Sequence, residues 1–330
     1  MIDTLELVVA THARLLVVTL DRAFRLKDRQ VLAQGHHYGI ALPDGDGRRF
    51  WAKSDDRALT CYERTDGGTW RVTGTLPFRR RVGYVHQIAH ANGGLYIANT
   101  TYNSVVYQDD TGQIEHEYTF YGRHDGRNHV NSVYPGPGFV FVLLHNKDRE
   151  PSQVVLCAHS LRTGFRPMLT LGLGHFGCHN VFVDQEYVVY NASRSGRFVV
   201  VTRQNPAVVR ELSFPGHVKG LAVTADHLIL GYSDHAPRSQ RAASAGYLVI
   251  LDRRQWEPLA TVDLNADGPV GNINEIRCLS QPDHAHATGD PGLQALQPFW
   301  LLRETLWQRY RRLLLTAWRR RFSAAPGRDL

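Results

Sequence analysis

A six-fold repeat limits what this chain can fold into more than any other feature. Six five-residue segments, each ending in an aliphatic residue and followed by a turn and a strand, begin at residues 36, 84, 129, 177, 217 and 272. Their starts are 48, 45, 48, 40 and 55 residues apart, about 47 on average. A period of about 40–50 residues with four short strands is typical of a β-propeller blade. The sequence therefore predicts an all-β, six-bladed β-propeller.

Both ends of the chain supply strands to one shared blade. Residues 5–11, 14–20 and 30–35 read as three outer strands with no inner strand before them. Residues 271–279 read as an inner strand with no partners after it. Because an unpaired sheet edge invites aggregation, we expect one C-terminal and three N-terminal strands to close the ring. Residues 1–282 are therefore predicted to form the propeller.

The net charge of +7 is concentrated at the C-terminus. Residues 299–330 contain eight Arg and two acidic residues, a local charge of +6, so the rest of the chain is nearly neutral. Apolar residues at three- and four-residue spacing predict a basic amphipathic α-helix and tail there, after a linker over 283–298. Residues 299–322 are expected to lie on an anionic membrane surface, dock on a protein partner or pack on the propeller. The neutral body argues against nucleic-acid binding.

The remaining composition favours an intracellular chain without a nucleotide cofactor. Four cysteines lie far apart, which favours free thiols in a reducing compartment. Charged residues interrupt the N-terminal apolar stretch, which matches neither a signal peptide nor a membrane span. We expect a cytoplasmic location, with peripheral attachment to the inner membrane as an alternative. No P-loop, G-x-S-x-G or strand-linked G-x-G-x-x-G motif is present.

Polar residues recur at equivalent positions of the six segments, on one face of the strand that enters the channel. Position one holds His36, Tyr84, His129, Gly177, His217 and Asn272, and position three holds Tyr38, His86, Asn131, His179, Lys219 and Asn274. Polar residues in a propeller channel often serve only to bind water and backbone groups. Five histidines at these positions exceed that requirement, so we predict a ligand or catalytic site at the channel mouth.

Two sets of these residues suit a divalent metal ion. Three imidazoles from alternate blades could form a triangle for Zn, Fe(II) or Mn: His36, His129 and His217. A mixed nitrogen and oxygen set suits Mn or Ca: His86, Asn131, His179 and Glu275. The sequence does not decide between the two sets.

Catalytic and substrate-binding candidates accompany the metal candidates. At a narrow mouth Lys219 is partly desolvated, and with His179 and Tyr38 it is a candidate for proton transfer. Loops that open on the same mouth carry further polar side chains, and we expect an anionic substrate to be bound by Asn99, Arg194, Arg238 and Asn274. No role is predicted for His12, His90, His124, His284 and His286, and His37 is predicted to be structural.

Three segments carry a resemblance to a known family. NHVNSVY at 128–134, PGHVKGLAV at 215–223 and the GYS…GYLVILD stretch at 231–252 resemble a bacterial family of conserved hypothetical propeller proteins. The resemblance covers about residues 84–279 and implies the fold without an activity. More distantly, the architecture is similar to six-bladed gluconolactonases and strictosidine synthases, whose lactonase members hold a divalent metal with Glu, Asn and Asp. That likeness implies Glu275, Asn131 and Asn180 as counterparts, although their order along the chain differs.

Together these features predict a metal-dependent hydrolase or lyase that acts on a small, polar, anionic molecule at the channel mouth. The alternative is a non-catalytic binding or scaffold propeller that its C-terminal helix attaches to a membrane or partner.

Overall fold

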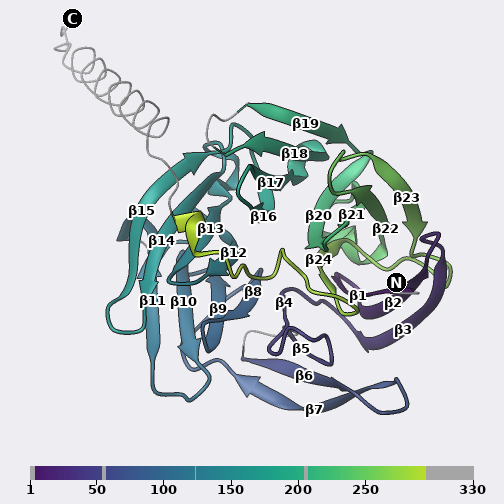
Figure 1. Cartoon of the computed structure of the whole chain (residues 1–330), viewed down its shortest axis with the longest axis horizontal. Coiled ribbons are helices and arrows are strands. Elements are labelled where there is room, and N and C mark those ends of the chain that lie inside the picture. Colours follow the sequence, from purple (N-terminus) through teal and green to yellow (C-terminus); the bar gives the residue numbers. More distant parts are fainter. Residues whose placement is uncertain (1–3, 54–56, 123, 204–206, 295–330) are drawn as a thin grey trace, which may run out of the picture.

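Six four-stranded antiparallel sheets surround a central channel (Figure 1). The computed structural model describes residues 4–53, 57–122, 124–203 and 207–294. The predicted all-β, six-bladed propeller is confirmed. The helix and tail predicted over 299–330 lie outside the described residues.

Five blades are each built from four consecutive strands, counted from the channel outward. Blade 1 contains β4 (Ile40–Ala41), β5 (Arg49–Lys53), β6 (Ala58–Arg64) and β7 (Trp70–Pro77). Blade 2 contains β8 (Ile88–Ala91), β9 (Gly94–Asn99), β10 (Ser104–Asp109) and β11 (Glu115–Thr119). Blade 3 contains β12 (Val130–Gly136), β13 (Phe139–Leu144), β14 (Gln153–Ser160) and β15 (Gly164–Gly172). Blade 4 contains β16 (Cys178–Val183), β17 (Tyr187–Ala192), β18 (Arg197–Thr202) and β19 (Val208–Ser213). Blade 5 contains β20 (Gly216–Val223), β21 (His227–Asp234), β22 (Gly246–Asp252) and β23 (Pro258–Asp263).

The sixth sheet takes its strands from two distant parts of the chain. Its order is β24 (Ile273–Cys278), β1 (Thr4–Thr11), β2 (Arg14–Asp21) and β3 (Leu26–Gln34). β24 pairs antiparallel with β1, with Cys278 opposite Leu7 and Glu275 opposite Ala10. We call this sheet blade 6.

The second and third strands of a blade are buried on both faces because each sheet packs between two neighbours. All residues of β9, β10 and β13 are buried, whereas most residues of the outer strands β7 and β23 are exposed or half-buried. Five clusters of buried apolar side chains fill the spaces between neighbouring blades. Burial of this apolar surface is the main stabilising contribution of the ring.

Short 3₁₀ helices interrupt the loops: η1 (Phe120–Gly122), η2 (Asn146–Asp148), η3 (Ser193–Ser195), η4 (Arg238–Ala243) and η5 (Pro291–Gln294). In the part of the chain that the structure describes, no helix is long and apolar enough to cross a membrane.

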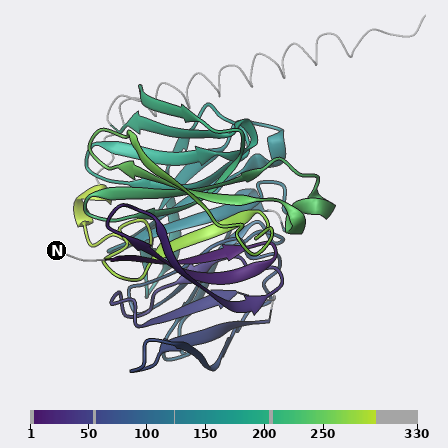
Figure 2. The same cartoon turned by 90° about the vertical axis from the view of Figure 1, so that its right-hand side faces the viewer.

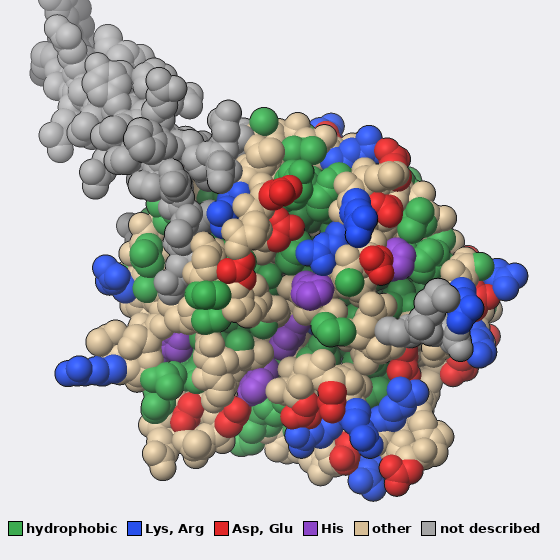
Figure 3. Space-filling model, viewed as in Figure 1, with side chains coloured by type: hydrophobic (Ala, Val, Ile, Leu, Met, Phe, Trp, Pro, Cys, Tyr) green, Lys and Arg blue, Asp and Glu red, His purple; other side chains and the backbone are tan. Residues whose placement is uncertain are grey.

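Residues 280–294 cross the end of the channel that faces the viewer in Figure 1. The buried Nε2 of His286 accepts hydrogen bonds from the backbone N–H groups of Leu42 (3.0 Å) and His90 (3.1 Å), in blades 1 and 2. Asp283 accepts the N–H of Val223 in blade 5 at 3.1 Å. His286, for which the sequence predicts no role, therefore helps to close this end of the channel. On this face, acidic and basic side chains are interspersed around the rim (Figure 3).

A buried ion pair on β24 lies at the centre of the ring. Arg277 Nη1 donates to Glu275 at 2.9 Å and to the carbonyl of Leu221 in blade 5 at the same distance. Glu275 accepts a hydrogen bond from Gln87 of blade 2 at 2.9 Å, and Gln87 accepts the N–H of Val133 in blade 3 at 2.8 Å. Both charged side chains are almost completely buried. The pair therefore links blade 6 to distant parts of the ring.

We expect Arg277→Met to lower the free energy of unfolding by about 3–5 kcal/mol, because the carboxylate of Glu275 would lose its buried charge partner. Denaturant unfolding measures the change. Arg166→Met, on an exposed position of β15, is the control and should stay within about 0.5 kcal/mol of the parent protein. Adding Glu275→Gln to Arg277→Met should recover part of the loss. Equal losses for Arg277→Met and Arg166→Met would contradict this role.

Candidate functional site

A cavity of about 470 Å³ opens at the channel mouth, and residues of η4 contribute to its lining. Figure 2 shows η4, in bright green, and η5, in yellow, at opposite faces of the ring. The lining residues of the cavity are His12, Tyr38, Tyr84, His86, His129, His145, Gly177, His179, Ser193, Arg194, His217, Lys219, Arg238, Arg241, Asn272, Ile273 and Asn274. Among the described residues that line it there is no Asp or Glu. The cavity therefore combines imidazoles and cations without a carboxylate on its wall.

A β-bulge in β20 places Lys219 at this cavity. The register between β20 and β21 shifts between Val218 and Leu221, so Lys219 and Gly220 together face Gly231. Gly220 has a φ of +86°, a conformation that favours glycine. A Cβ on Gly231 would lie 2.4 Å from the carbonyl oxygen of Lys219, so the partner strand also requires glycine. Bulges commonly redirect a side chain next to a functional site.

Blade 4 holds this bulge in place. Asn180 Oδ1 accepts the N–H of Gly220 at 2.8 Å, and Asn191 Nδ2 donates to its carbonyl at 3.2 Å. Both Asn side chains are buried. The backbone next to Lys219 is thus fixed from a neighbouring blade.

Three consecutive blades begin their channel segments with a residue in the left-handed conformation. The φ values are +52° for Tyr84, +50° for His129 and +65° for Gly177. For residues other than glycine this conformation costs about 1 kcal/mol or more, and such strain gathers at functional sites. These are position-one residues of the sequence repeat, and all three line the cavity.

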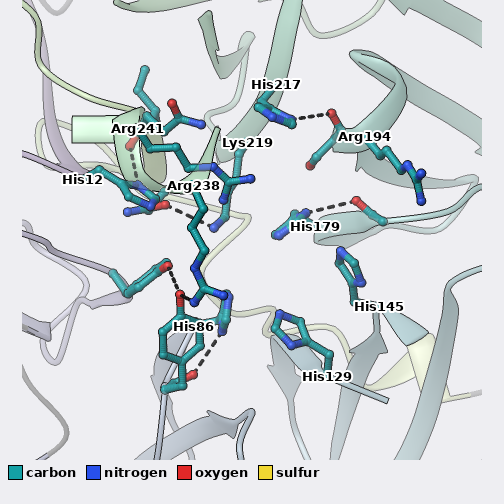
Figure 4. Close-up of a pocket in the computed structure, with 17 residues that line it drawn as sticks. His12, His86, His129, His145, His179, Arg194, His217, Lys219, Arg238 and Arg241 are labelled. Carbon is teal, nitrogen blue, oxygen red and sulfur yellow. Dashed lines mark hydrogen bonds between the residues drawn. The ribbon is translucent and has the colours of Figure 1, made fainter. Parts of the chain in front are cut away.

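Four histidines form a ring on one side of the cavity (Figure 4). Ring centroids are 4.6 Å apart for His86 and His129, 5.0 Å for His129 and His145, and 5.2 Å for His145 and His179. His179 and His86 close the ring at 6.4 Å. We call these residues the histidine ring.

Backbone groups determine which nitrogen carries the proton in three members of the ring. His86 Nδ1 lies 3.0 Å from the carbonyl of Tyr84, and His179 Nδ1 lies 3.1 Å from that of Gly177. A carbonyl can only accept, so in each neutral ring Nδ1 donates and Nε2 keeps a lone pair.

His145 has the opposite tautomer. Its Nδ1 accepts the backbone N–H of Lys147 at 3.1 Å, so the proton of the neutral ring is on Nε2. The histidine ring therefore combines hydrogen-bond acceptors with a donor.

Desolvation and mutual repulsion keep these imidazoles neutral. Removal from water, together with the charges of His145 and Lys147, lowers the pKa of His129 to about 2. Desolvation also lowers the pKa of His86 and of His179 well below the ordinary value. These three rings are therefore uncharged at neutral pH.

Lys219 is the most perturbed cation of the cavity. Desolvation, followed by repulsion from Arg241, lowers its pKa to about 7, although Glu275 opposes the shift. Its Nζ donates to Asn274 Oδ1 at 3.2 Å and lies 4.9 Å from the ring centre of Tyr38. The amine is thus distributed between its charged and neutral forms near pH 7.

Two arginines of η4 complete the positive wall. Arg238 extends across the mouth and donates to the hydroxyl of Tyr84, which lies 3.2 Å from the hydroxyl of Tyr38 (Figure 4). The Nε of Arg241 is buried without a hydrogen-bond partner, while its backbone carbonyl accepts the N–H of Asn272 at 2.9 Å. A buried guanidinium N–H without a partner is suited to receive an anionic ligand.

The structure brings most of the predicted site residues together. Nine line the cavity: Tyr38, His86, His129, His179, Arg194, His217, Lys219, Arg238 and Asn274. Four do not line it: His36, Asn99, Asn131 and Glu275. His36 packs on His12 with ring centroids 4.0 Å apart, and Asn99 is buried, with its Oδ1 accepting the N–H of Gly83 at 2.9 Å. Asn131 and Glu275 are buried, and Glu275 is bound to Arg277.

The cavity lining also includes residues to which the sequence prediction gives no site role, among them His12, His145 and Arg241. His12, for which the sequence predicts no role, lines the cavity, because the β1–β2 turn reaches the same mouth as the equivalent loops of other blades. His145 and Arg241 also follow the second strand of their blades. Their place in the blade repeat is the signal that could have found them.

The described residues do not fit a divalent metal ion as they are arranged. No group of three or more His, Cys, Asp or Glu among them is placed to hold one. The surrounding Lys219, Arg238 and Arg241 repel a cation, and the oxygen ligand Glu275 is engaged by Arg277. The predicted metal ligands therefore stay a prediction.

No protein-family model matches the sequence, and no curated protein matches it significantly. Solved structures nevertheless share its fold. A chain of a nidogen/laminin complex superposes with a TM-score of 0.59 at 12% identity, covering 84% of this chain and 99% of that one. A provisionally named 6-phosphogluconolactonase from Bacteroides fragilis gives 0.53 at 10% identity, with coverages of 84% and 98%. Another from Bacteroides uniformis gives 0.50 at 11% identity, with coverages of 79% and 82%. At these identities the similarity shows the propeller fold.

We expect the cavity to bind oxalate, a small dianion, and to bind it more tightly at pH 6 than at pH 8.5. Lys219 carries its positive charge below a pKa of about 7 and loses it above. Isothermal titration calorimetry should show at least a tenfold loss of affinity, about 1.4 kcal/mol, for Lys219→Met or Arg241→Met.

Lys27→Met, on an exposed position of β3, is the control and should keep the parent affinity. Oxalate binding that none of these substitutions changes would place the anion elsewhere.

Proposed function

We propose that this propeller is an enzyme of the hydrolase type that acts on a small, polar, anionic molecule in the mouth cavity. One observation carries the proposal. Lys219, a cation whose charge is lost near neutral pH, lies among neutral imidazoles and arginines on a wall without carboxylates. Groups with pKa values near the working pH are the effective catalysts of proton transfer.

Substrate binding is assigned to the arginines. Arg194, Arg238 and Arg241 line the cavity and present planar guanidinium groups, which bind carboxylate or phosphate through paired hydrogen bonds. Arg241 has the buried N–H without a partner, so it is the first candidate for direct contact with the anion.

Proton transfer is assigned to Lys219 and its neighbours. In its neutral form the Lys219 amine can take a proton from the attacking water. The Nε2–H of His145 can donate to the oxygen that gains charge, as can the hydroxyl of Tyr38, whose pKa burial raises above its ordinary value. His179 Nε2 offers a second acceptor for a proton. None of these steps requires a metal ion, so a divalent cofactor is not part of the proposed mechanism.

The names of the two Bacteroides neighbours indicate the first compounds to test. Both names refer to hydrolysis of a phosphorylated lactone, which is a small anionic ester. A panel of lactones that carry a phosphate or carboxylate therefore suits this cavity. Binding of these compounds without turnover would favour the alternative, a non-catalytic binding propeller.

We expect kcat for an accepted lactone to rise as the pH increases through about 7, because the neutral amine of Lys219 is the active form. Lys219→Arg keeps the charge but stays protonated, so it should lower kcat by about 100-fold or more at pH 8. Hydrolysis corrected for the uncatalysed rate at each pH measures both effects.

Lys53→Arg is the matched control, because the Nζ of Lys53 also lies near the Tyr38 ring, at 5.3 Å, but outside the cavity lining. It should keep the parent pH profile. Unchanged activity of Lys219→Arg would contradict the assigned role of the amine.

A further inference from the structure

The chain uses lysine very sparingly, and it places one at the cavity. Of its 38 basic residues, only four are Lys, at positions 27, 53, 147 and 219. Arginine supplies the same positive charge, but its guanidinium stays protonated and is a poor nucleophile. Among the described residues that line the cavity, Lys219 is the single primary amine. In a chain that otherwise favours arginine, a lysine at this position indicates that the amine does more than supply positive charge: it can also lose its proton and react as a nucleophile.

The surroundings of Lys219 favour a nucleophilic amine. The amide oxygen of Asn274 holds Nζ at 3.2 Å, and the nearby carboxylate of Glu275 is already bound to Arg277. An ammonium ion that is withdrawn from water and stabilised by a neutral amide gives up its proton readily. The bulge at Gly220, fixed from blade 4, holds the amine in position.

An anion-binding group accompanies the amine. Arg241, whose Nε has no hydrogen-bond partner, lines the same cavity as Lys219, and repulsion between the two side chains lowers the pKa of Lys219. Figure 4 shows Lys219, Arg238 and Arg241 directed into the same space. A substrate that both reacts with the amine and binds to the guanidinium group has an electrophilic carbonyl carbon next to a carboxylate.

We propose that Lys219 forms a reversible imine with 2-oxo acids, whose carboxylate is bound by Arg241. This inference rests on the anion-binding cavity of the proposed function and adds a covalent use of the same amine. The ε-amine adds to the carbonyl carbon to give a carbinolamine. Loss of one water then forms the carbon–nitrogen double bond, and hydrolysis reverses the step without an oxidant or reductant.

The histidine ring supplies the proton transfers that these steps need. Addition moves a proton from nitrogen to the former carbonyl oxygen, and dehydration needs a donor to the departing hydroxyl. The Nε2–H of His145 is a donor, and the Nε2 lone pairs of His86 and His179 are acceptors. The resulting iminium is the electron sink of lyase reactions that break a bond next to the carbonyl carbon.

Borohydride trapping tests the proposal. The full-length protein is incubated with pyruvate, reduced with sodium borohydride and digested, and the label on each of the four lysines is measured by mass spectrometry. We expect at least tenfold more label on Lys219 than on Lys27, which lies on an exposed position of β3. Lys219→Arg should lose this label, and Lys53→Arg should keep it.

A second pair of measurements separates directed binding from general amine reactivity. Arg241→Met should lower the labelling of Lys219 by pyruvate at least tenfold more than its labelling by uncharged propanal, which measures what the loss of repulsion from Arg241 alone does to the amine. Equal labelling of Lys219 and Lys27, or equal sensitivity of both reagents to Arg241→Met, would overturn the proposal.

Oxalate binding by the same preparation separates failure of this inference from failure of the proposed function. Oxalate has carboxylates but no ketone. If it binds in an Arg241-dependent way and pyruvate leaves no label on Lys219, the imine is wrong and the anion cavity stands. If neither compound interacts, both proposals are wrong.

Discussion

The structure depends on one buried ion pair, Glu275 with Arg277, at the centre of the ring. A propeller has no continuous core, because each sheet packs only on its two neighbours, so its inner strands need a shared anchor. Arg277 binds backbone of blade 5, and Glu275 reaches Gln87 and through it blade 3. Such a pair is costly to desolvate, and it is tolerated here because hydrogen bonds satisfy most of its polar atoms. Segment 280–294 crosses the channel at one end of the ring. The cavity lies at the other end, where the described lining residues include Lys and Arg but no Asp or Glu.

The pairing of Glu275 with Arg277 below the cavity helps to explain how a nearly neutral propeller has a positively charged mouth without carboxylates. Glu275 is already paired with Arg277, so it offsets the positive charge of Lys219 only in part. Local features of the backbone then determine where the side chains point. A bulge places Lys219, left-handed residues place Tyr84 and His129, and carbonyl groups determine the tautomers of His86 and His179. The chemistry of the mouth follows from backbone geometry as much as from residue type.

The sequence predicts the fold well because blade periodicity is a property of many residues at once. It also identifies most of the cavity, since inner strands converge by topology, as Tyr38, His86 and Lys219 show. It fails where position depends on contacts between distant segments. Glu275 cannot be distinguished from a metal ligand without knowing that Arg277 lies 2.9 Å away. Asn99 has the composition of a binding loop, yet its side chain holds the backbone of Gly83. His12, by contrast, follows the second strand of blade 6, so the predicted closure could have identified it as a residue of the mouth.

The central claim is that the cavity shifts Lys219 toward a neutral amine. Nuclear magnetic resonance titration of protein labelled with ¹³C at lysine Cε tests it directly, because four lysines give a simple spectrum. We predict one lysine with a pKa of about 7, whose signal is missing from the spectrum of Lys219→Arg. A spectrum in which no lysine titrates near pH 7 would contradict the account.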